Sequence, residues 1–83
     1  MHFNEIDDGD YRIYVGAIEA SVGAGYTAAV VINRLRGVPR PREAFRDSAL
    51  AGGHRWLTPG EALSYAVNAG RQVLRSQRER LAC

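Results

Sequence analysis

Cysteine is nearly absent from this sequence, because Cys83 is the only one and stands last among 83 residues. A lone cysteine forms no internal disulfide and lacks the neighbouring thiols or imidazoles of a zinc site. We expect Cys83 to be a terminal thiol without a role, and an intermolecular disulfide in vitro is the alternative. Asp7, Asp8 and Asp10 lack the glycine and the distal glutamate of a calcium loop. No metal and no cofactor are therefore expected.

Long apolar runs are also missing. No stretch approaches the ~18–20 apolar residues that a membrane-spanning helix requires, so we expect no contact with a membrane. The segment Met1–Asp8 is acidic and lacks the basic start and the apolar centre of a signal peptide. These observations predict a cytoplasmic protein.

Lysine does not occur, so all eleven basic residues are arginine. Together with the many alanines and glycines, this bias is typical of a GC-rich genome and favours a bacterial source. The charge is uneven: residues 1–33 hold five acidic side chains and one arginine, whereas residues 34–83 hold ten arginines and four acidic side chains. The overall charge of +2 is small for a protein that binds nucleic acid.

Residues that catalyse reactions are scarce. The two histidines, His2 and His54, lie in a terminal segment and in a glycine-rich turn. Ser48 and Ser64 have no partner in the sequence that would activate a nucleophile. The sequence therefore predicts that the protein is not an enzyme, and it offers no catalytic, cofactor-binding or metal-binding residues.

The clearest structural signal is a helix in the last third of the chain. Thr58 is placed to be its N-cap, Pro59 fits the first helical position, and Glu61 completes a capping box. Apolar residues then recur at three- and four-residue steps and form one stripe: Leu63, Ala66, Val67, Gly70, Val73 and Leu74. Glycine at position 70 lowers the stability of the helix by roughly 1 kcal/mol relative to alanine. Its place in the apolar stripe therefore indicates that the helix closely approaches the surface that it covers. Leu57, just before the cap, is expected to begin a hydrophobic staple.

Three strands are expected ahead of this helix. Segments 10–20 and 26–35 are rich in β-branched and aromatic residues and predict a hairpin that closes through the glycine-containing turn 21–25. The proline-rich segment 36–42 must be a loop, and a short third strand follows at 43–48. The expected fold is α+β: a three-stranded antiparallel meander packed on one face by a single long C-terminal helix.

The chain is short enough to be a single domain, residues 1–83. Within it we expect a lead-in at 1–9, the meander at 10–50 and the helix at 58–79, with Pro59 and Arg78 near the helical ends. In the first strand, Ile18 departs from the alternation of the preceding apolar residues. Gly16 is therefore interpreted as a bulge that shifts the phase.

Two short motifs resemble the N-terminal modules of HicB-type antitoxins. They are Gly25-Tyr26-Thr27-Ala28-Ala29-Val30 and, later, Gly53 followed by Thr58-Pro59-x-Glu61-Ala62-Leu63-x-x-Ala66. In that family a glycine–tyrosine–threonine strand, a third strand and a threonine-capped helix follow one another, and small uncharacterised bacterial proteins share the layout. The resemblance covers about residues 11–75 and implies a fold and a habit of binding other proteins. The proline-broken loop 36–42 is not part of the family's pattern.

Association with another protein is the function that the pattern favours most. The run Ala28–Ile32 is apolar on both faces of its strand, whereas a single helix covers only one face. The remaining face, or an edge strand, is expected to bind a protein partner or a second copy in a homodimer. The alternative is a monomer in which the N-terminal segment covers that face and the small side chains of Ala28 and Ala29 leave little to bind.

Nucleic-acid binding through an arginine-rich loop at 34–46 is the second hypothesis. Arginine side chains bind phosphates, and aromatic rings stack on bases. The candidate contacts, for a partner or for nucleic acid, are Arg34, Arg36, Arg40, Arg42, Arg46, Arg55 and Trp56. For Trp56 there is a simpler interpretation, which is that it covers the start of the helix.

Overall fold

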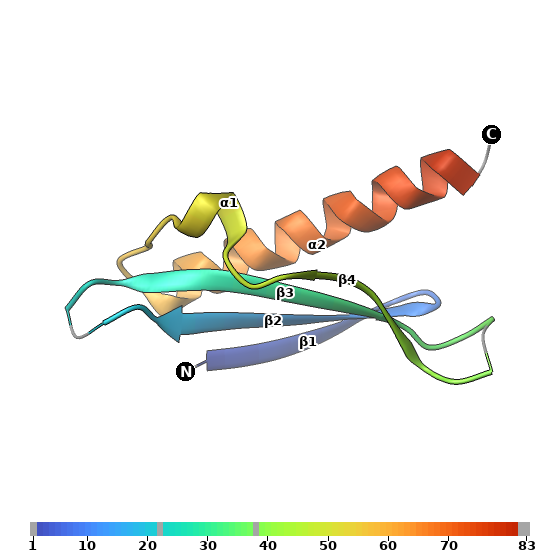
Figure 1. Cartoon of the computed structure of the whole chain (residues 1–83), viewed down its shortest axis with the longest axis horizontal. Helices are drawn as coiled ribbons and strands as arrows, with labels where there is room; N and C mark the ends of the chain where they lie inside the picture. Colours follow the sequence, from blue (N-terminus) through green and yellow to red (C-terminus); the bar gives the residue numbers. More distant parts are fainter. Residues whose placement is uncertain (1, 22, 38, 82–83) are drawn as a thin grey trace.

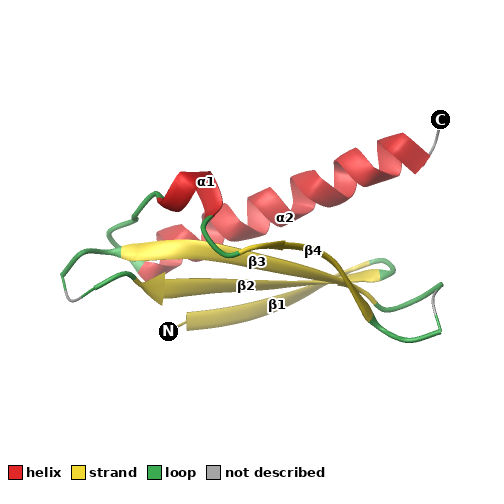
Figure 2. Cartoon of the chain, in the orientation of Figure 1, coloured by secondary structure: helices red, strands yellow, loops and turns green. Residues whose placement is uncertain are grey.

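The chain forms a four-stranded antiparallel sheet with one long helix across one face (Figures 1 and 2). The computed structural model describes residues 2–21, 23–37 and 39–81, with side chains as far as Ser76, so Cys83 lies outside the described residues. The elements in order are β1 (His2–Asp8), β2 (Tyr11–Glu19), β3 (Tyr26–Arg34), β4 (Arg42–Asp47), the single turn α1 (Leu50–Gly53) and α2 (Pro59–Leu81). The strands lie side by side in chain order, so the meander and the C-terminal helix are confirmed.

Strand β1 corrects the predicted strand count from three to four. It occupies the segment expected to be a lead-in and pairs with β2 over its whole length, from His2 opposite Ala17 to Asp8 opposite Tyr11. Its sequence carries few strand-forming residues, because a strand at the edge of a sheet tolerates polar side chains on both faces. Its extended form is therefore set by hydrogen bonding to β2 rather than by local propensity.

Strands β2 and β3 pair in unbroken register over the nine residues of each. The bulge predicted at Gly16 is therefore wrong. Alternation continues through this position, because Ala17 takes the next buried site and Ile18 points to the opposite face. A register shift occurs instead between β3 and β4, next to Ile32, where Ala44 is the extra residue of β4.

The hydrophobic core lies between α2 and the face of β2 and β3 that points toward it. Its buried residues are Ile13, Val15, Ala17, Ala28, Val30, Ile32, Leu50, Ala62, Ala66 and Leu74. Gly70 of α2 marks the closest approach: a Cβ there would lie 2.8 Å from Cγ2 of Ile13 and 3.2 Å from Cγ2 of Val30. The close packing predicted at Gly70 is confirmed.

The start of α2 shows the predicted cap. The hydroxyl oxygen of Thr58 accepts a hydrogen bond from the backbone N–H of Glu61 at 3.2 Å. The predicted staple is wrong, because Leu57 is 87% exposed and packs on nothing that would anchor the helix. Among the described residues, no helix combines the length and the apolar character that crossing a bilayer requires.

The segment ahead of α2 is tied to the first residue of β3. The backbone N–H and C=O of Trp56 bond to the C=O and N–H of Tyr26, both at 2.8 Å. Gly25 has a φ of +83°, and a Cβ there would stand 2.6 Å from the carbonyl oxygen of Trp56, so only glycine fits. The indole ring lies 4.8 Å from the ring of Tyr65 on α2. Trp56 thus covers the start of the helix, as the simpler interpretation held.

Candidate functional site

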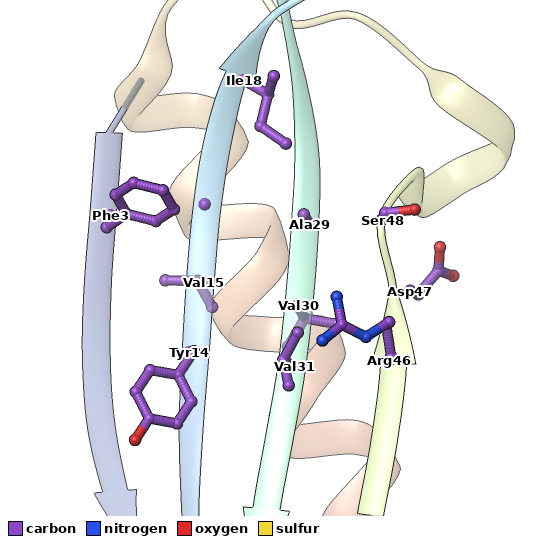
Figure 3. Close-up of a pocket in the computed structure, with 11 residues that line it drawn as sticks. Phe3, Tyr14, Val15, Ile18, Ala29, Val30, Val31, Arg46, Asp47 and Ser48 are labelled. Atoms are coloured by element: carbon purple, nitrogen blue, oxygen red, sulfur yellow. The ribbon is translucent and has the colours of Figure 1, made fainter. Parts of the chain in front are cut away.

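The face of the sheet that points away from α2 is covered by no other element among the described residues (Figure 1). We call it the open face and define it by residues Phe3, Tyr14, Gly16, Ile18, Ala29 and Val31. Figure 3 views it directly, with the helix behind the sheet. The alternative in which the N-terminal segment covers this face is wrong, because β1 lies beside β2 in the plane of the sheet.

The strand register arranges the open-face side chains in rows. Phe3 on β1 lies opposite Gly16, which lies opposite Ala29. The next row, from β1 to β4, is Glu5, Tyr14, Val31 and Arg46. Apolar side chains therefore occupy the two central strands of this row, and charges of opposite sign occupy the two edge strands.

A shallow hollow lies beside the ring of Phe3. Phe3 is 71% exposed, and a Cβ at Gly16 would be 3.4 Å from Cε1 of its ring, so the glycine admits the ring close to β2. The small side chain of Ala29 leaves a hollow of about 200 Å³ between Ile18 and Ser48 (Figure 3). Small-molecule sites usually measure about 300–1,000 Å³, so this hollow has the size to take one side chain of a partner.

Ion pairs form a polar rim at one end of the open face. Arg12 Nε lies 2.7 Å from Asp7 Oδ1, and Arg46 Nη2 lies 2.7 Å from Glu43 Oε1. The hydrogen bond that Arg12 donates to the Asp7 carboxylate raises the pKa of Arg12 above its ordinary value, so this guanidinium is charged at every physiological pH. Glu5, by contrast, makes no ion pair within the described part of the chain.

The sequence-predicted contact residues lie in three separate places. The end of β3, the following loop and the first residue of β4 hold Arg34, Arg36, Arg40 and Arg42. Arg46 lies on the open face, in the row of Val31. Arg55 and Trp56 lie at the other end of β3, beside Tyr26. Nine residues of β3, roughly 30 Å of strand, separate the two ends, so these side chains do not form one surface.

The acidic and basic segments of the chain meet at the loop end of the sheet. The backbone N–H groups of Leu35 and Arg36 donate to the carbonyl oxygen of Asp10 at 2.7 and 3.4 Å. Arg34 is half-buried, places its guanidinium 5.9 Å from the ring centroid of Tyr11, and donates to the carbonyl oxygen of Arg36. The charge asymmetry along the sequence is therefore not a separation of charge in space.

The histidines lie away from the open face. His54 packs edge-on against the ring of Trp56 at 4.6 Å, and His2 packs against Tyr26 at 6.0 Å. In the ranges 2–21, 23–37 and 39–81, no group of three histidine, cysteine or acidic side chains is arranged to hold a metal ion. The geometry at these histidines is that of aromatic packing.

Sequence reasoning missed three open-face residues: Phe3, Glu5 and Tyr14. The first two lie in the segment that was expected to be a lead-in, and the tyrosine was assigned to a strand without a face. The segment shows no two-residue alternation of apolar and polar side chains, because its apolar residues Phe3 and Ile6 lie three positions apart. Five of its seven residues are polar or acidic, so composition did not indicate a strand either.

The residues that carry the HicB resemblance have architectural roles here. Gly25 admits the Trp56 carbonyl, Tyr26 pairs with Trp56, and Thr58 caps α2. The resemblance to that family stays a prediction. Comparisons of the chain with protein-family models, with curated proteins and with solved structures find no match.

Proposed function

We propose that this chain is a non-catalytic binding module that docks another protein chain on its open face. The observation that carries the proposal is the half-buried apolar centre of the sheet, formed by Tyr14, Ile18 and Val31 on the two central strands and covered by no other described element. Contiguous apolar surface on a folded domain is typical of interaction sites, because removing it from water contributes about 25 cal/mol per Å² of favourable free energy. The charged edge strands on either side supply the polar rim that such interfaces have.

The shape of the open face favours a protein over a small ligand. It is broad and shallow, and the hollow beside Ala29, about 200 Å³, has the size of a side chain rather than of a cofactor. Sheets pack on other sheets, or on helices, through faces of this kind.

The edges of the sheet are less suited to pairing than its face. Strand β1, at one edge of the sheet, carries the acidic residues Glu5, Asp7 and Asp8, and β4 at the other edge is six residues long, charged and interrupted by a register shift. Short, charged and bulged edges are the features that discourage strand addition. The proposal therefore places the partner on the face.

A site-specific photo-crosslink tests the proposal. Replacing Tyr14 with p-benzoylphenylalanine puts a photoreactive ring on the open face, and the same replacement at Asn68 puts it on the exposed side of α2 as the matched control. We expect irradiation of cells that make the protein to give a covalent protein adduct from position 14 and none from position 68. Equal yields from both positions, or no adduct from position 14, would contradict the proposal.

Nucleic-acid binding is the second candidate, and the cluster of arginines at the loop end favours it. Arg36, Arg40 and Arg42 are exposed there, beside the partly buried Arg34. The neighbouring Asp10 and the other acids of the β1–β2 end weaken the positive field that binding to phosphates requires.

Replacing Arg36, Arg40 and Arg42 together with alanine tests this second function. If the loop binds nucleic acid, single-stranded RNA or DNA will bind the wild-type chain with an affinity that falls as salt rises, and the triple variant will lose it. The absence of binding by the wild-type chain at low salt would exclude the function. A triple substitution at Arg71, Arg75 and Arg78 removes the same charge elsewhere and serves as the control.

A further inference from the structure

We propose that the occupant of the open face is a second copy of this chain, docked face to face about a two-fold axis parallel to β2 and β3. The inference rests on the proposed function, because it names the partner of the same surface. Its basis is the row in which Glu5 and Arg46, on opposite edges of the sheet, flank Tyr14 and Val31. When the two-fold axis rotates this row onto the second copy, its negative end faces the positive end of the first copy.

A two-fold axis along the strands exchanges the two edges of the sheet. The rotation places β1 of each copy over β4 of the other copy, so the same contact occurs twice in the dimer. Each Glu5 then faces Arg46 of the second copy. The edge strands stand three strand spacings apart, about 15 Å, so the two ion pairs enclose the apolar centre formed by Tyr14 and Val31.

Both charged groups are free to make this contact. Glu5 is exposed and makes no ion pair within the described part of the chain. Arg46 uses Nε and Nη2 on a single oxygen of Glu43, and its side chain is 62% exposed. The Nη1 group of the guanidinium fork is thereby left to donate to a second carboxylate.

The charges disfavour two other symmetric arrangements. An axis across the strands would lay β1 over β1, with Glu5 facing the acidic side chains of the same strand, and Arg46 facing Arg46. Pairing two β1 strands edge to edge would gather the same acids. Like charges brought together at an interface disfavour association, so of the two face-to-face arrangements the row of Glu5 and Arg46 favours the axis along the strands.

The shape of the open face agrees with the same axis. The rotation carries Phe3 of the second copy across the sheet to the side of Ala29 and Ser48, where the hollow lies. Phe3 is the exposed projection of each copy, and the hollow beside Ala29 is the recess. Each copy therefore offers one projection and one recess to the other.

The polar rim and the area of the interface determine the affinity of the dimer. Asp7 of one copy comes near Glu43 of the other, but each carboxylate already pairs with an arginine of its own chain. The sheet face measures about 15 Å by 30 Å, a footprint smaller than the ~800 Å² per partner of a standard interface. We therefore expect a weak dimer, with a dissociation constant in the micromolar range.

Charge exchange at the two positions tests the arrangement by sedimentation equilibrium. Glu5→Arg and Arg46→Glu each turn both ion pairs of the homodimer into like-charge contacts, so each is expected to weaken self-association about tenfold or more. In an equimolar mixture of the two variants every contact is again attractive, so the mixture is expected to regain the wild-type affinity as a heterodimer. The double variant Glu5→Arg/Arg46→Glu is expected to regain it as a homodimer.

The matched controls are Glu19→Arg and Arg71→Glu, which make the same changes of net charge at exposed positions away from the open face. Each control is expected to associate as the wild type does. Circular dichroism and the unfolding midpoint establish that every variant is folded.

Three results would overturn the inference: a wild-type chain that is monomeric at about 1 mM, single variants that associate normally, or a mixture and a double variant that stay monomeric. Its failure is distinguishable from failure of the proposed function. If the wild type is monomeric while Tyr14→p-benzoylphenylalanine captures a different protein, only the second copy is excluded. If position 14 captures nothing, both proposals fail.

Discussion

Strands β2 and β3 carry apolar side chains on both faces of the sheet, but the two faces differ in how deeply these side chains are buried. Toward α2, Ile13, Val30 and Ile32 are at most 1% exposed. On the opposite face, the alternate residues Tyr14 and Val31 remain only half-buried. The comparison teaches that apolar character alone does not decide burial here. The topology supplies one long helix, which covers one face and leaves the other to a partner.

The covered face is also the one that fits a helix closely. Ala62, Ala66 and Gly70 of α2 lie against the sheet without large side chains between the two backbones. The open face has instead a projecting Phe3 and a recess beside Ala29, which suit a second irregular surface. Packing on the first face is intramolecular and tight, and packing on the second is expected to be intermolecular and weaker.

The largest expected difference between the faces is in stability. Ile32→Ala removes a fully buried side chain and is expected to lower the free energy of unfolding by about 3 kcal/mol. Val31→Ala, at the adjacent residue on the open face, is expected to cost less than about 1 kcal/mol in the monomer. Urea unfolding of both variants at low micromolar concentration measures the contrast. Equal losses would show that both faces are buried in the monomer.

A smaller effect is expected where α2 touches the sheet. Gly70→Ala places a Cβ 2.8 Å from Cγ2 of Ile13, and we expect a net loss of about 1–2 kcal/mol although alanine favours the helix. Gly60→Ala is the matched control, because a Cβ there meets nothing within 4 Å, and it is expected to leave stability unchanged or slightly raised. Stabilisation by Gly70→Ala would mean that the helix lies farther from the covered face.

The smallest expected effect concerns the cap that fixes the start of α2. Thr58→Ala removes the hydroxyl that accepts the Glu61 N–H and is expected to cost about 1 kcal/mol. Ser64→Ala, on the exposed side of the same helix, is the control and should change stability by less than about 0.5 kcal/mol. An unchanged unfolding midpoint for Thr58→Ala would show that the cap does not hold the helix on the covered face.

The sequence predicted the covered face well, because its signals are local. The cap at Thr58, the three- and four-residue spacing of the α2 stripe and the close approach at Gly70 each follow from neighbouring residues, and the structure confirms all three. The run Ala28–Ile32, apolar at every position, also indicated that a second face would lack a helix.

The open face was harder to predict, because its composition depends on pairing between distant residues. Phe3 and Glu5 join it only through the register of β1 with β2, which no local pattern states. The bulge assigned to Gly16 was wrong for a related reason. Glycine there leaves room for the ring of Phe3 on the neighbouring strand and does not shift the alternation.

The grouping of Arg55 and Trp56 with the arginine loop was not reproduced by the structure for a topological reason. The chain returns along the sheet between Arg42 and Trp56, and the hydrogen bonds of Trp56 to Tyr26 fix that residue at the opposite end of β3. Closeness in sequence therefore did not become closeness in space.

The methyl resonances of two adjacent valines test the central claim most directly. Val30 lies in the core beneath α2, and Val31 lies on the open face. Spectra are recorded at protein concentrations from about 20 μM to 1 mM, the range over which a weak dimer forms. We expect the Val31 methyl signals to shift with concentration and those of Val30 to stay in place. Concentration-dependent shifts confined to the arginine loop or to the edge strands, with Val31 unchanged, would contradict the account.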